Sequence, residues 1–152
     1  MFKRFITFCI VCSCFFIVGC SSVKDVDLDS IIDNIAKTTI LENMKEGDSK
    51  TLKRYFGLNS KDFEDFVLYT PSYTMDVEEL LILKLKDNSQ IDFVEDIIES
   101  RVDKQIETFG SYGPDQCALL EEYELKVKDK YVFYTVSENS DEIIDIFKES
   151  IK

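Results

Sequence analysis

The residues best suited to chemistry are cysteines, four of which lie close together near the N-terminus: Cys9, Cys12, Cys14 and Cys20. Their spacing, Cys-x-x-Cys and Cys-x-Cys, is typical of metal and dithiol redox sites. The first three, however, lie inside the almost wholly apolar run Phe5–Val18, which follows the cations Lys3 and Arg4. A short basic segment before such a run is typical of a secretory signal peptide. We therefore expect these three cysteines to be removed with the signal peptide.

Cys20 differs from the other three because of the residues around it. The apolar run ends in Ile17-Val18-Gly19-Cys20 and is followed by the polar pair Ser21-Ser22. These four residues resemble the lipobox of bacterial lipoproteins, in which the cysteine thiol receives a diacylglyceryl group and the chain is cut just before it. The resemblance implies membrane attachment without a spanning helix, because two acyl chains such as palmitate suffice for stable anchoring. The alternative is an uncleaved N-terminal helix with an incidental cysteine.

This interpretation divides the chain into three parts. Residues 1–19 are the predicted lipoprotein signal peptide, residues 20–28 the lipidated Cys20 with a short tether, and residues 29–152 a single extracytoplasmic domain. Loss of Lys3 and Arg4 on cleavage changes the net charge from −12 to −14. We expect so acidic a domain to be repelled by nucleic acid and by an anionic lipid surface.

Other candidates for chemistry are weak. The sequence contains no His, which removes the commonest general base near neutral pH and a common zinc ligand. Asp25-x-Asp27-x-Asp29 opens like a calcium loop, but Ala36 stands where that loop needs a bidentate Glu. Cys117 is interpreted as a small buried apolar residue, and Glu78 and Glu79 as solvated residues at a strand start. We therefore assign no catalytic residue and predict no metal and no cofactor.

The elements that must position any site predict an α+β domain. The expected helices are residues 29–44, 49–56 and 87–109 and a last helix capped by residues 138–140; the expected strands are 62–69, 78–86, 123–128 and 131–137. This order predicts a four-stranded antiparallel sheet in a repeated strand-strand-helix order, preceded by one or two N-terminal helices. We expect both long helices on one face of the sheet. The two halves of the repeat resemble each other mainly in the Asn-Ser pair that caps each helix, Asn88-Ser89 and Asn139-Ser140. Such caps are common, so a coincidental similarity is the alternative.

One candidate binding site is a face of the last strand. Its residues are apolar on both sides, with Val132, Tyr134 and Val136 on one side and Tyr131 and Phe133 on the other. The second side is either covered by the N-terminal helices over residues 29–56 or open to a partner or ligand.

The other candidate binding site is the predicted loop over residues 110–116. Gly110, Tyr112, Gly113 and Pro114 lie close together in it. Functional loops have this composition, and so do plain turns between elements.

Four segments resemble a lipoprotein family of unknown function from clostridia and related Firmicutes: the lipobox, the EELLILKLKD strand, the helix that ends in FGSYGPDQ, and the VKDKYVFYTVSEN hairpin. The resemblance covers roughly residues 78–152 and implies a lipid-anchored domain on the outer face of a Gram-positive cell membrane. We expect a non-enzymatic binding module for another envelope protein or a small ligand, or a purely structural accessory subunit. The alternative is an envelope enzyme that works through carboxylates or Tyr.

Overall fold

A computed structural model describes residues 24–152, so the predictions for Ile17, Val18, Gly19 and Cys20 lie outside the described residues. The elements are α1 (Leu28–Ile35), β1 (Met44–Glu46), α2 (Ser49–Phe56), β2 (Phe63–Pro71), β3 (Glu79–Leu85), α3 (Ile91–Phe109), α4 (Pro114–Glu121), β4 (Glu124–Lys128), β5 (Tyr131–Val136) and α5 (Ser140–Ser150). Short 3₁₀ turns at Ser60–Asp62 and Asn88–Gln90 precede β2 and α3. None of the helices in this part of the chain is long and apolar enough to cross a membrane.

The strands form one antiparallel sheet in the order β1-β2-β3-β5-β4. The mixed helix and strand class with an antiparallel sheet is confirmed, but the predicted number of four strands is wrong. The fifth strand, β1, lies at one edge and pairs Met44 with Pro71 of β2. The predicted helix over residues 29–44 is therefore too long, since α1 ends at Ile35 and Met44 begins a strand.

The early end of α1 has a local cause. Two adjacent threonines follow the helix, and the Thr38 hydroxyl donates a hydrogen bond of 2.6 Å to the Ile35 carbonyl. Side chains of this type compete with helical backbone hydrogen bonds and favour turns. The helix also begins one residue earlier than predicted, at Leu28, with Asp27 as its N-cap.

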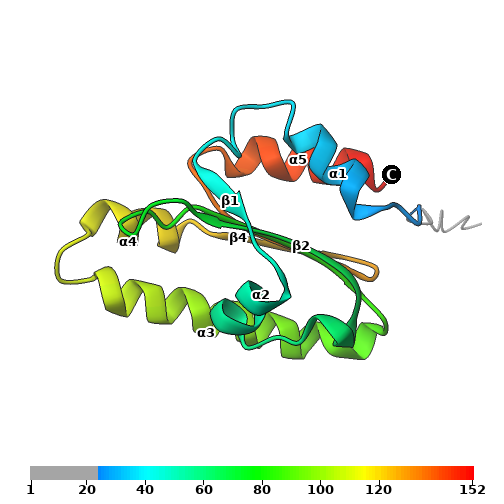
Figure 1. The fold of residues 1–152 in the computed structure, drawn as a ribbon, viewed down its shortest axis with the longest axis horizontal. Coiled ribbons are helices and arrows are strands. Elements are labelled where there is room, and N and C mark those ends of the chain that lie inside the picture. Colours follow the sequence, from blue (N-terminus) through cyan, green and yellow to red (C-terminus); the bar gives the residue numbers. More distant parts are fainter. Residues whose placement is uncertain (1–23) are drawn as a thin grey trace, which may run out of the picture.

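Helices cover both faces of the sheet, with α1 and α5 on one face and α2 and α3 on the other (Figure 1). The expectation that both long helices share one face is therefore wrong: α3 and α5 lie on opposite sides. The physical reason is that β3 and β5 are apolar on both faces, so each face needs its own cover. The repeated strand-strand-helix order is not confirmed, and α4 is inserted between α3 and β4.

The alternation of β5 matches the predicted division into two sides. Val132, Tyr134 and Val136 belong to the core beneath α2 and α3, and Tyr131 and Phe133 belong to the core beneath α1 and α5. The Phe133 ring stacks on Phe147 of α5 with ring centroids 4.7 Å apart. The Tyr131–Phe133 side is thus covered by α1 together with α5, while the second N-terminal helix, α2, covers the opposite face.

Candidate functional site

The predicted loop over residues 110–116 is a tight corner between α3 and α4. Pro114 begins α4, so only the first half of the predicted loop is non-helical. A Cβ atom on Gly113 would lie 2.8 Å from Gln116 Oε1 and 2.9 Å from the Phe109 ring, which explains the glycine by close packing. The Tyr112 ring remains exposed beside Phe109. Gly110, Tyr112, Gly113 and Pro114 therefore lie together at this corner, where close packing explains Gly113 and Pro114 begins the next helix.

Tyr131 holds the start of the described chain against the domain. Its hydroxyl accepts a hydrogen bond of 2.8 Å from the Val26 N–H and donates one of 2.9 Å to the Val26 carbonyl. Beside it, the Asp25 carboxylate lies 2.8 Å from Lys84 Nζ, and this hydrogen bond holds the pKa of Asp25 below its ordinary value. Neither Tyr131 nor Phe133 is exposed, so this candidate face is core.

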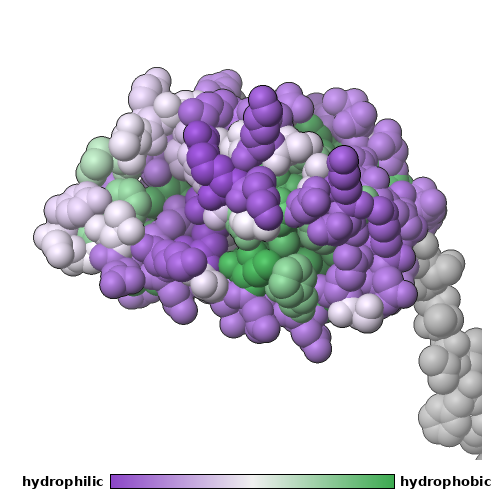
Figure 2. All heavy atoms as spheres, turned by 60° about the horizontal axis from the view of Figure 1, so that its bottom comes forward, coloured by the Kyte–Doolittle hydropathy of each residue, from purple (hydrophilic) through white to green (hydrophobic). Residues whose placement is uncertain are grey.

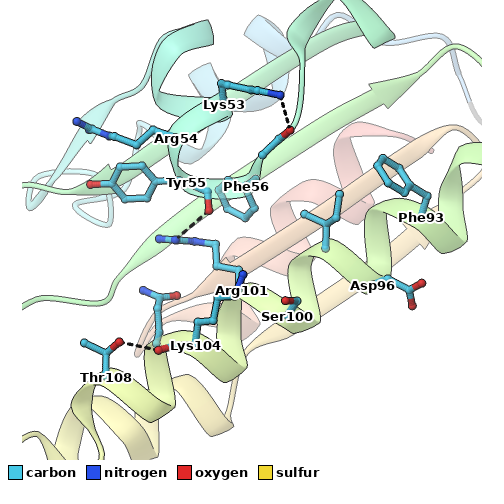
Figure 3. A pocket seen from close by; sticks show the side chains of 13 residues that line it. Lys53, Arg54, Tyr55, Phe56, Phe93, Asp96, Ser100, Arg101, Lys104 and Thr108 are labelled. Carbon is cyan, nitrogen blue, oxygen red and sulfur yellow. Dashed lines mark hydrogen bonds between the residues drawn. The ribbon is translucent and has the colours of Figure 1, made fainter.

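A groove of about 740 Å³ lies between α2 and α3, and no prediction pointed to it. It is lined by Lys53, Arg54, Tyr55, Phe56, Gly57, Phe93, Asp96, Ile97, Ser100, Arg101, Lys104, Gln105 and Thr108 (Figure 3). A second hollow of about 270 Å³ shares Tyr55, Arg101 and Gln105 with it and reaches Tyr73 in the loop between β2 and β3. The two hollows adjoin at these shared residues, and we call them together the α2–α3 groove.

Local signals at both ends define the bounds of α2, which forms one wall of the groove. The Asp48 side chain accepts a hydrogen bond from the Thr51 N–H at 2.9 Å, and Gly57 ends the helix in the left-handed conformation with φ of 72°. Leu52 and Phe56 are buried against the sheet, which leaves Lys53 and Arg54 exposed. These two cations also lie favourably in the last turn, at the negative end of the helix dipole.

A buried ion pair fixes α3 relative to α2 and the sheet. Arg101 donates two hydrogen bonds to the Glu79 carboxylate, at 2.8 Å from Nε and 2.5 Å from Nη2. Tyr134 donates a third to the same carboxylate at 2.7 Å. Arg101 Nη1 also donates to the Tyr55 carbonyl at 3.3 Å, and the guanidinium lies 4.8 Å from the centre of the Phe56 ring. The network thus joins β3, β5, α3 and α2.

Glu79 was interpreted from sequence as solvated, and that interpretation is wrong, because its side chain is fully buried. A buried carboxylate of this kind requires charged or hydrogen-bonding partners, which Arg101 and Tyr134 supply. Burial, and secondly the nearby Glu79 carboxylate, raise the pKa of Tyr134 well above its ordinary value. The Tyr134 hydroxyl therefore stays protonated and continues to donate. Since all three groups are occupied by one another, Arg101 positions the groove rather than offering its charge to a ligand.

Three other cations of the groove have no acidic partner within the described residues. Salt bridges occur elsewhere in residues 24–152, but none includes Lys53, Arg54 or Lys104. Lys53 Nζ instead donates to the Gly57 carbonyl at 3.2 Å, and the Arg54 guanidinium lies 5.0 Å from the centre of the Tyr55 ring. Two acidic residues line the groove, Asp96 in the larger hollow and Asp76 in the smaller, and Asp96 points away from Arg101 (Figure 3). The groove is therefore a positively charged site on an acidic protein.

A sequence signal for this site existed and was missed. Residues 49–61 contain Lys50, Lys53, Arg54 and Lys61 and no acid, although the chain has 30 acidic residues. Composition averaged over the chain conceals such a run, whereas charge patterning along the chain would have revealed it.

The remaining candidates do not form a site. Within residues 24–152, no group of three or more His, Cys, Asp or Glu residues is arranged to hold a metal ion. Of the acidic triplet, Asp27 is the N-cap of α1 and Asp29 lies in its first turn. Cys117 is half-buried and its thiol lies 3.7 Å from the Ile106 carbonyl, between α4 and α3.

The family described as "Domain of unknown function (DUF4358)" matches residues 37–137, about two thirds of the chain. No curated protein and no solved structure matches the chain. The matched segment includes all five strands and both helices of the α2–α3 groove, whereas α1 and α5 lie outside it. The groove is therefore part of the family domain. The chain belongs to the family defined by the domain of unknown function DUF4358.

Proposed function

We propose that this protein is a lipid-anchored, non-enzymatic binding module of a bacterial cell envelope, and that the α2–α3 groove is its binding site. The observation that carries the proposal is that Lys53, Arg54 and Lys104, which have no salt-bridge partner in residues 24–152, line a groove on a strongly acidic chain. Charges left without partners around a concave surface are available to a ligand. The Glu79–Arg101 pair supports the same role, since it holds the two walls of the groove together before a ligand arrives.

The position of the N-terminus also supports this role. The described chain enters the domain at Asp25 and Val26, which contact Tyr131 on the α1–α5 side of the sheet. The helices α2 and α3, whose residues line the groove, lie on the other face (Figure 1). An anchor at Cys20 would thus attach the domain by the α1–α5 side and leave the groove accessible.

Binding is favoured over catalysis by the state of the carboxylate–tyrosine pair beside the groove. A carboxylate and a tyrosine meet at Glu79 and Tyr134, but both are fully buried and hydrogen-bonded to each other. A general acid or base must lie within hydrogen-bond reach of a substrate. Buried and occupied groups do not meet this requirement.

The anchor is tested at Cys20. Mass spectrometry of the membrane fraction is expected to find a diacylated peptide that begins at Cys20, and Cys20→Ala is expected to block processing or to release the domain from the membrane. Cys117→Ala is the matched control, since it removes the thiol that lies between α3 and α4 and should leave the protein in the membrane. A full-length, membrane-retained chain with an unmodified Cys20 would show that the anchor has been assigned wrongly.

The groove is tested by photocrosslinking in the native cells. A benzoylphenylalanine in place of Phe93, an exposed residue of the groove lining, is expected to form one reproducible adduct that mass spectrometry identifies. The same photoreactive residue in place of Lys148, which lies exposed on α5, is the control and should not form that adduct. No adduct from position 93, or the same adduct from both positions, would refute the groove as the binding site.

A further inference from the structure

The chemistry of the groove also indicates what it binds. We infer that its ligand is an acidic segment of a partner polypeptide, with apolar side chains among its carboxylates, bound in an extended conformation. The inference rests on the proposed function, because it names the ligand class of the same groove. Three features of the groove carry it: the cations without a salt bridge in residues 24–152, the apolar surface beside them, and a buried acceptor that lacks a donor.

The cations select an anion. Lys53 and Arg54 are exposed in the last turn of α2, and Lys104 is exposed on α3 across the groove, so a bound segment lies between cations on both walls. The net charge of the chain opposes such a ligand only at long range, since salt screens charges beyond about 8–10 Å at physiological ionic strength. At contact distance the lining decides the interaction, and its three cations without a salt bridge outnumber its two carboxylates, Asp96 and Asp76.

The apolar surface excludes a ligand that consists of charge alone. Phe93 is 59% exposed, and it lies in the lining together with Ile97 and Phe56. Figure 2 shows an apolar patch on this face of the molecule, surrounded by hydrophilic side chains. A polyphosphate would leave this patch in water, whereas a peptide can cover it with its own apolar side chains. A patch of this kind with a polar rim is typical of protein interaction sites.

The buried acceptor is the amide oxygen of Gln105, which has no hydrogen-bond partner among the described residues. Gln105 lines both hollows and so lies where they adjoin. A buried acceptor without a partner is costly and calls for an N–H or O–H donor. Ionised carboxylates and phosphodiesters only accept hydrogen bonds, but a peptide backbone carries an N–H at nearly every residue. An extended peptide therefore satisfies the cations, the apolar patch and Gln105 together.

The experiment uses the full-length protein in neutral detergent and isothermal titration calorimetry. The probe is a synthetic peptide of about twelve residues in which Glu alternates with Leu or Phe, a length that spans a groove of this kind when extended. A control peptide with Gln in place of every Glu tests whether binding depends on the negative charges. The Glu peptide is expected to bind saturably at physiological ionic strength, and the Gln peptide about tenfold or more weakly, since three cations lose their partners.

Protein variants assign the binding to the groove. We expect the affinity for the Glu peptide to fall about tenfold or more in the triple variant Lys53→Gln, Arg54→Gln, Lys104→Gln. The matched control, Lys37→Gln, Lys148→Gln, Lys152→Gln, removes the same charge from exposed positions on the α1–α5 side and should bind as the wild type does. Gln105→Leu should weaken binding of the peptide more than binding of polyphosphate, because it removes the acceptor but none of the cations. Thermal unfolding of each variant shows that it is folded.

The alternatives give different results. If polyphosphate or phosphatidylglycerol vesicles bind and lose binding in the groove triple variant, while the Glu peptide does not bind, the peptide inference is overturned and the groove remains a binding site. If the Gln peptide binds as tightly as the Glu peptide, charge does not select the ligand and the inference is also overturned. If no probe binds but the photocrosslink at position 93 forms, the ligand class is wrong and the proposed function stands. If that crosslink is absent as well, both fail.

Discussion

Glu79→Ala is expected to lower the free energy of unfolding by about 3–5 kcal/mol, because it leaves a largely buried charge without its partner. Glu79 is fully buried and accepts hydrogen bonds from Arg101 and from Tyr134. Its removal leaves the Arg101 guanidinium, whose side chain is only 13% exposed, beside an empty space. Urea or guanidinium unfolding followed by circular dichroism measures the change.

The neighbouring residue supplies the control for this measurement. Glu78 is only partly buried and accepts a hydrogen bond from the Ser137 hydroxyl at 2.9 Å. Glu78→Ala removes the same chemical group but no buried ion pair, so we expect a cost of about 1 kcal/mol or less. Equal losses in the two variants would show that the Glu79–Arg101 pair adds nothing to stability. Glu79→Leu removes the charge but keeps most of the side-chain volume, whereas Glu79→Ala removes both. The difference in unfolding free energy between the two variants therefore gives the contribution of the lost volume.

The second large effect is expected at Phe133. Phe133→Ala should cost about 3–5 kcal/mol of unfolding free energy, as truncations of buried Phe residues do. The Phe133 side chain is fully buried and stacks on Phe147 beneath α1 and α5. A cavity at this point cannot close easily, because the sheet lies on one side and helices on the other.

Phe93→Ala is the matched control, since Phe93 is exposed and its loss should change stability by no more than about 0.5 kcal/mol. The two variants also separate structure from function. Phe133→Ala protein that is still folded should bind the groove ligand normally, because the sheet lies between Phe133 and the groove. If Phe133→Ala protein is stable but its partner no longer co-purifies with it, the binding site lies on the α1–α5 side instead.

Elements with local signals were predicted closely. The helix over residues 49–56 was expected at the bounds that α2 has, because an N-cap and a left-handed glycine mark its two ends. The sides of β5 were predicted because side chains alternate in a strand whatever it pairs with. β1 was missed, since three residues carry no periodic pattern and its strand conformation depends on pairing with β2.

For the site, the sequence by itself determined the charges and the elements that carry them. Residues 49–61 are basic in any fold, and the spacing along α3 determines that Val94, Ile98 and Val102 share one face. Only the tertiary structure decided which helix covers which face, since both faces of β3 and β5 are equally apolar. It also decided that Glu79 is buried, because its partners, Arg101 and Tyr134, lie 22 and 55 residues away along the chain. Charge is a property of each residue and can be counted in a sequence, whereas burial depends on distant segments that meet only when the chain folds.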